Sequence, residues 1–97
     1  MEGGLLFRVL TPAKEVCSCR CDNVNLTEKD DAEGRGGGSI GIRRGHLPAV
    51  IALADSGSVR ASAEGNTVFA AIVCGGFARV DSSSVTVLTP GAEVLKE

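Results

Sequence analysis

Short runs of β-branched and other apolar residues recur along the whole chain, and Gly, Pro, Asp, Asn and Ser interrupt them at close intervals. No segment keeps an apolar 3.6-residue period beyond two turns, so the pattern predicts strands and not amphipathic helices. The expected strands cover residues 5–10, 15–26, 38–42, 49–53, 59–63, 67–74, 77–80 and 85–88. The chain is therefore predicted to be all-β.

One segment, residues 48–54, allows an alternative, because Pro48 would suit the first position of a short helix. Since Asp55-Ser56-Gly57 follows at once, we interpret this segment as a strand. A hairpin is expected around Glu64-Gly65-Asn66, whose Gly and Asn tolerate positive φ. About eight strands in 97 residues can bury their apolar faces only in two packed sheets or a closed barrel. We expect one domain, residues 1–97, with a sandwich or flattened-barrel architecture.

Residues 27–38 are charged and rich in glycine, and we expect them to form an exposed, mobile loop that adds nothing to the core. The six residues from Gly36 to Gly41, which begin at the end of this segment, match G-x-G-x-x-G. A dinucleotide site needs a strand before that motif and a helix opening from it. Here an acidic loop precedes the glycines, and Gly45 and Pro48 would break a helix after them. No cofactor is predicted.

Cys17, Cys19 and Cys21 alternate within one expected strand, whereas Cys74 stands alone. The Cα atoms of alternate strand residues lie about 6.6 Å apart. Thiolates that share one zinc ion must lie within about 4 Å of each other. We therefore predict no metal site and interpret the three residues as small apolar side chains lining one face of a buried strand. The bunched spacing is also unlike a disulfide framework and indicates a reducing cytosol.

The balance of charge excludes several partners. A net charge of −2, a pI near 5.4 and only three aromatic residues offer neither a basic field nor stacking platforms for nucleic acid. The N-terminus is unlike a signal peptide, and no stretch approaches the ~20 apolar residues of a membrane helix. Membrane association is therefore expected only through a protein partner. His46, the single histidine, has no local catalytic motif, and no catalytic residue is predicted.

Two blocks of sequence carry a resemblance to a known family. The segment Gly38-Ser39-Ile40-Gly41-Ile42-Arg43-Arg44-Gly45-His46-Leu47-Pro48 resembles the Gly-x-(apolar)-Gly-(apolar)-x-x-Gly-His-x-Pro signature of the epsilon subunits of bacterial and organellar ATP synthases. The Gly-Gly-Phe-x-x-Val of residues 75–80 and the Val-Thr-Val-Leu of residues 85–88 resemble two strands of the same family. Weaker agreement extends the match over about residues 7–92, with the blocks in the family's order.

The resemblance implies a ten-stranded β-sandwich, a flattened barrel of two sheets, which binds the gamma subunit and contacts the c-ring. Such a domain is a non-catalytic part of the central stalk, or rotor, of a proton- or sodium-translocating F-type ATP synthase. It would lie in the cytoplasm, peripheral to the inner face of the cell membrane. The family normally continues into a C-terminal helical hairpin, which is missing before this sequence ends at Glu97.

Residue by residue, the resemblance implies a c-ring interface and a set of structural positions. The ring interface comprises Ser39, Arg43, Arg44 and His46. The structural positions are Gly41, Gly45, Pro48, Gly75, Gly76 and Phe77. The sequence departs from the family in two places: Arg43-Arg44 replaces an apolar residue and Pro, and the preceding loop is longer and more acidic.

Two other classes of function stay open. A stand-alone small β-barrel assembly or binding module would be favoured by stable rings that form without a gamma subunit. An enzyme that uses the glycine loop or the cysteines would be favoured by binding of nucleotide or stoichiometric zinc to the isolated protein.

Overall fold

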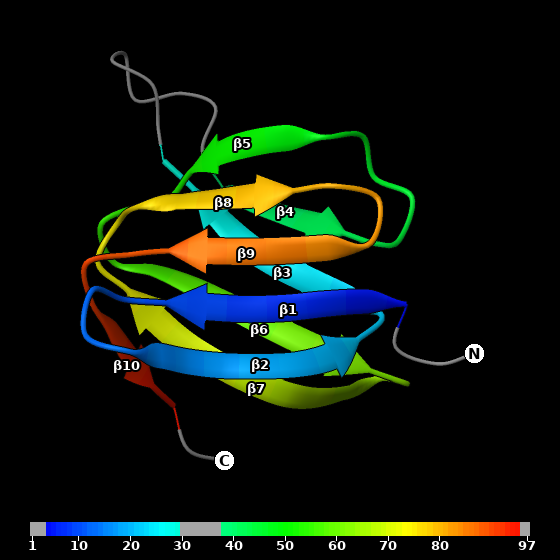
Figure 1. Ribbon diagram of the computed structural model, residues 1–97, viewed down its shortest axis with the longest axis horizontal. Helices are drawn as coiled ribbons and strands as arrows, with labels where there is room; N and C mark the ends of the chain where they lie inside the picture. The colour runs from blue at the N-terminus through cyan, green and yellow to red at the C-terminus, as the bar shows by residue number, and fades with distance from the viewer. Residues whose placement is uncertain (1–3, 30–37, 96–97) are drawn as a thin grey trace.

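The computed structural model describes residues 4–29 and 38–95, in which it places ten β-strands and no helix (Figure 1). The strands are β1 Leu5–Leu10, β2 Glu15–Cys21, β3 Asn23–Glu28, β4 Gly38–Ile42, β5 Ala49–Ala52, β6 Gly57–Ala63, β7 Asn66–Val73, β8 Phe77–Val80, β9 Ser84–Leu88 and β10 Ala92–Val94. The all-β prediction is confirmed. Over these described residues, nothing helical is long and apolar enough to span a membrane.

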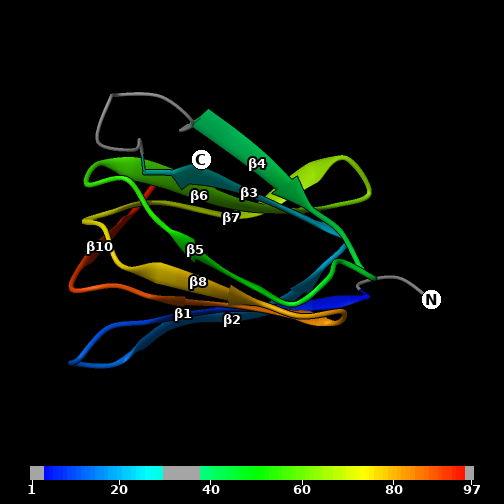
Figure 2. The same cartoon turned by 90° about the horizontal axis from the view of Figure 1, so that it is seen from above.

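The strands form two five-stranded sheets. The first sheet has the order β2-β1-β9-β8-β5, and the second sheet has the order β10-β7-β6-β3-β4. The paired strands are antiparallel except β1 and β9, which run parallel. Seen from above, the two sheets lie face to face as two layers (Figure 2). The predicted ten-stranded sandwich is confirmed.

The core lies between the two sheets and follows from the alternation of side chains along each strand. In β1, every second residue from Leu5 to Val9 is fully buried, and the residues between them face outward. The core is built almost wholly from Val, Leu, Ile and Ala, as the composition predicts. Phe7 is its one fully buried aromatic side chain, and the ring of Phe69 packs against it with a centroid distance of 6.0 Å.

The long strand predicted over residues 15–26 is two strands in the structure. The chain leaves the first sheet after Cys21, which pairs with Leu5, and enters the second sheet at Asn23, which pairs with Ser62. Asp22 marks this crossing, where its N–H donates to the carbonyl oxygen of Ser62 at 2.9 Å. At this crossing the inward residues change from odd positions, ending with Cys21, to even positions, beginning with Val24. The prediction of one strand was wrong because this shift of one residue separates two strands.

Other boundaries differ by smaller amounts. The segment from Ala49 onward is a strand and not a helix, and it pairs with β8. The hairpin turn is confirmed, with positive φ at Glu64 and Gly65. Strand β10 was not predicted, because it has only three residues. The predicted loop 27–38 is shorter at both ends, since 27 and 28 belong to β3 and 38 to β4, and its residues 30–37 lie outside the described part.

The connections between strands gather at two opposite ends of the sandwich (Figure 1). One end, called the Ser39 end, carries the start of β4 and the connections 53–56 and 74–76. The other end, called the His46 end, carries the connections 43–48 and 81–83. At the Ser39 end, Gly75 and Gly76 take the chain from the second sheet to the first, with φ of +81° and +102°.

Candidate partner-docking face

The outer face of the first sheet carries an apolar row that crosses four strands. Leu10 of β1 pairs with Leu88 of β9, Leu88 pairs with Phe77 of β8, and Phe77 pairs with Ala52 of β5. The side chain of Phe77 is 54% exposed and that of Leu88 is 41% exposed. Large apolar side chains that gather on an exposed face are typical of interaction surfaces.

A second row beside it mixes charge with apolar surface. Arg8, Thr86, Arg79 and Val50 are successive cross-strand partners on β1, β9, β8 and β5. Val50 is 67% exposed. We call the two rows together the docking face. An open groove of about 650 Å³ runs over the second row and reaches Leu10 and Leu88 of the first, and Pro48 also lines it.

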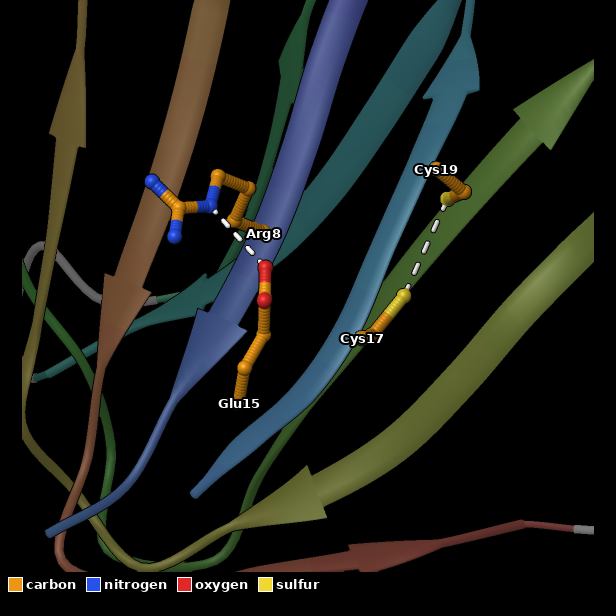
Figure 3. A network of polar contacts seen from close by, with 4 residues as sticks. All are labelled: Arg8, Glu15, Cys17 and Cys19. Carbon is orange, nitrogen blue, oxygen red and sulfur yellow. Dashed lines mark hydrogen bonds and ion pairs between the residues drawn. The ribbon is translucent and has the colours of Figure 1, made fainter.

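The charges at this groove are partly matched within the protein. Arg8 Nε donates to Glu15 Oε2 at 3.1 Å, and both side chains remain well exposed (Figure 3). The backbone N–H of Ser83 and the hydroxyl of Ser84 donate to Asp81, and with nearby Arg79 they lower the pKa of that carboxyl. Exposed pairs of this kind contribute only about 0–1 kcal/mol each. The guanidinium groups therefore stay available to carboxylates of a partner.

The residues predicted to meet the ring do not form one cluster. Ser39 is exposed near the start of β4, beside Thr27 of β3. Arg43, Arg44 and His46 lie beyond the other end of β4. Arg43 lies four positions after Ser39 along the extended chain, a distance of about 13 Å. The sequence placed His46 near Ser39, and this is corrected: the two residues belong to opposite ends of the sandwich.

A hydrogen bond joins the turn that contains Gly45 and His46 to the connection 81–83 at the same end of the sandwich. Gly45 has a φ of +91°, and its N–H donates to the carbonyl oxygen of Ser82 at 2.7 Å. His46 Nδ1 lies 2.7 Å from the carbonyl oxygen of Leu47 and must carry the proton of that hydrogen bond. Leu47 follows with a side chain that is 79% exposed. The turn thus leads directly into residues 47–50, of which Pro48 and Val50 line the groove of the docking face.

The structure also describes the two features that the catalytic alternatives would use, the glycine motif and the possible metal ligands. After Gly41, the chain completes β4 and enters the Arg43–Pro48 connection, so no helix opens from the glycine motif where a pyrophosphate would need one. Among residues 4–29 and 38–95, no three His, Cys, Asp or Glu side chains come together as metal ligands.

Sequence reasoning missed the docking face as a site. Phe77 was expected to be structural, but its side chain points outward. Val50 and Leu88 were not singled out at all. The available signal was Leu88, a large apolar residue on the outward face of the strand Val85–Leu88, where a strand with one solvent-facing side needs none.

The comparisons with known proteins agree with this architecture. The family model described as "ATP synthase, Delta/Epsilon chain, beta-sandwich domain" matches residues 5–94. The ATP synthase epsilon chain of Nostoc punctiforme is 38% identical over 90 residues, which are 92% of this chain and 60% of that protein. The epsilon chain of Prochlorococcus marinus is 38% identical over 93 residues, which are 96% of this chain and 62% of that protein. The chain thus spans about 60% of the length of these relatives.

Solved structures show the same fold at low sequence identity. A chain in the Euglena gracilis mitochondrial ATP synthase structure (OSCP/F1/c-ring) superimposes with a TM-score of 0.74 at 21% identity, over 98% of this chain and 56% of that one. A chain in the Tetrahymena thermophila mitochondrial ATP synthase structure (central stalk and c-ring) superimposes with a TM-score of 0.65 at 14% identity. The superposition covers 92% of this chain and 65% of that one. With the family model covering nearly the whole sequence, the chain belongs to the family of ATP synthase delta/epsilon chains and represents its β-sandwich domain.

Proposed function

We propose that this chain is the β-sandwich domain of the epsilon subunit in the rotor of a proton- or sodium-translocating F-type ATP synthase. It has no catalytic role of its own and couples the motion of other subunits. The names of the relatives support the proposal, since each is an ATP synthase epsilon chain. The domain is cytoplasmic and reaches the inner face of the membrane only through the complex.

The docking face is the surface proposed to bind the gamma subunit. The observation that carries this assignment is the apolar row from Leu10 to Ala52. A row of this kind on a single sheet face gains free energy when another protein covers it, at about 25 cal/mol per Å² of apolar surface removed from water. Arg8 and Arg79 add sites for carboxylates at its centre. Arg43, Arg44 and His46 adjoin the same face through Leu47, and we reassign them from the ring to gamma.

The Ser39 end is the surface proposed to meet the c-ring. A rotor domain that touches two partners needs two separated surfaces, and Ser39 lies at the end of the sandwich away from His46. The sequence that leads from the end of β3 to the start of β4 is charged: residues 28–35 include four acidic and two basic residues, a local balance of −2. The polar, partly basic loops of a c-ring suit such a segment.

The gamma assignment is tested by a charge placed on the docking face. We expect Val50→Asp to weaken binding to the gamma subunit of the same genome by about tenfold or more, because an unpaired carboxylate in an interface must be desolvated. The matched control is Val68→Asp, which changes an exposed valine on β7 of the second sheet. The affinity of each variant is measured by its binding to gamma immobilised on a surface. Equal affinities for the two variants would contradict the assignment.

The ring assignment is tested by removing charge. The triple variant Asp30→Asn, Asp31→Asn, Glu33→Gln is expected to weaken association with the c-ring at low salt, and the difference should shrink at physiological salt, where screening acts within about 8 Å. The effect should be modest, because exposed pairs are worth about 0–1 kcal/mol. Gamma binding should not change. If gamma and ring were lost together, the segment would belong to the gamma interface instead.

A further inference from the structure

Two thiols meet at the open edge of the sandwich. Cys17 and Cys19 lie on β2, an edge strand of the first sheet, and their Sγ atoms are 3.8 Å apart (Figure 3). They pair across the strand with Val9 and Phe7, both of which point into the core. The two thiols therefore share the inner face of β2. Because no strand flanks β2 on its other side, both side chains are only half-buried.

This geometry revises the argument made from the sequence. Alternate residues of a straight strand were expected to hold their thiols too far apart for one ion, but the structure brings this pair within the required distance. Two thiolates bound to one ion at about 2.3 Å, with an angle of roughly 110°, stand about 3.8 Å apart. A disulfide bond needs about 2.05 Å. The observed spacing is that of an S–H···S hydrogen bond between two free thiols and not of a disulfide, and it is also the spacing that two ligands of one ion would have.

The number of ligands selects the kind of ion. Zinc in proteins takes four ligands. Within the described residues, no third His, Cys, Asp or Glu joins the pair as a ligand. Cys21 is the next residue on the same face, but it is completely buried in the core. Monovalent copper prefers thiolates and accepts two or three of them. An open position at the edge of the sheet would admit a small thiol from solution.

We propose that Cys17 and Cys19 form a binding site for monovalent copper at the edge of the sandwich. Binding joins Cu(I) to both sulfurs and releases the two thiol protons to solvent. Affinity should therefore increase with pH. The site lies on the inner side of the first sheet and does not depend on the proposed docking of gamma.

The proposal is tested with Cu(I) alone on the reduced full chain under anaerobic conditions, in competition with a chromogenic Cu(I) chelator. We expect one Cu(I) per chain, two protons released per ion, and X-ray absorption that shows two or three sulfur neighbours. Cys17→Ser and Cys19→Ser should each lower the affinity by at least about a hundredfold. Cys74→Ser is the matched control, because Cys74 is exposed and lies outside β2, directly after β7, and it should bind as the parent does.

Three results would overturn the proposal. The first is unchanged copper binding by the variant in which both Cys17 and Cys19 are serine. The second is loss of copper in Cys74→Ser. The third is stoichiometric zinc that remains bound through the pair while copper does not compete. Circular dichroism of each serine variant establishes that it is folded. The Cys17→Ala variant is a second way to remove the thiol, with an apolar side chain that suits the half-buried position.

Discussion

Replacing Gly76 by alanine is expected to lower the free energy of unfolding by more than about 3 kcal/mol, a large share of the 5–15 kcal/mol typical of a domain. Its φ of +102° already disfavours a side chain, at about 1–2 kcal/mol. A Cβ there would also overlap the carbonyl oxygen of Leu88 and lie 2.8 Å from Thr89 Cα. Both atoms belong to the backbone, so β9 would have to move away from its neighbours.

Gly75 provides the matched control for this experiment. Its φ of +81° imposes the same kind of strain, but the one tight contact of a Cβ there would be with Asp55 Oδ1 at 3.1 Å, since the carbonyl oxygen of Leu53 lies at an ordinary 3.9 Å. That atom ends an exposed side chain, which can turn away. Gly75→Ala should therefore cost about 1–2 kcal/mol in urea unfolding. If the two alanine variants lost the same stability, the close backbone approach at Gly76 would not be the cause.

The second large effect is expected at Phe7. Phe7→Ala should lower the free energy of unfolding by about 3–5 kcal/mol, because it removes a fully buried ring and leaves a cavity beside Phe69. The matched control is Phe77→Ala on the docking face. There the ring is half exposed, and the loss should stay below about 1 kcal/mol. Chemical denaturation of the two variants measures the difference. Comparable losses would mean that Phe77 is part of the core.

Most strands were predictable because the information is local. The alternation in Leu5–Leu10 and the Gly-rich turn after Ala63 each specify an element without knowledge of its neighbours. The change of sheet at Asp22 was not predictable, because the one-residue shift in alternation there would equally fit a β-bulge within one strand. Strand β10 is too short to produce a pattern. It is held by pairs such as Ala92 with Val73, a contact between distant parts of the chain.

The candidate sites were less predictable than the fold. The resemblance identified residues 38–48 as one block, but strand β4 separates Ser39 from His46 by its whole length. Conversely, Val50 and Leu88 are far apart in sequence, and only the order of strands in the first sheet brings them to one face. The spacing of the thiols of Cys17 and Cys19 depends on side-chain rotamers, which an ideal straight strand does not describe.

The parallel pairing of β1 with β9 has a consequence for how the protein is made. Leu6 lies opposite Ser84, so one edge of β1 stays unpaired from its own synthesis until residues 84–88 have been made. Meanwhile the β1–β2 hairpin has an apolar face and a free edge, which favour association with other nascent chains. Pairing over such a long sequence separation is also slow, typically milliseconds to seconds. Cotranslational folding of the first sheet should therefore be late, and its yield should depend on chaperones that shield the N-terminal hairpin.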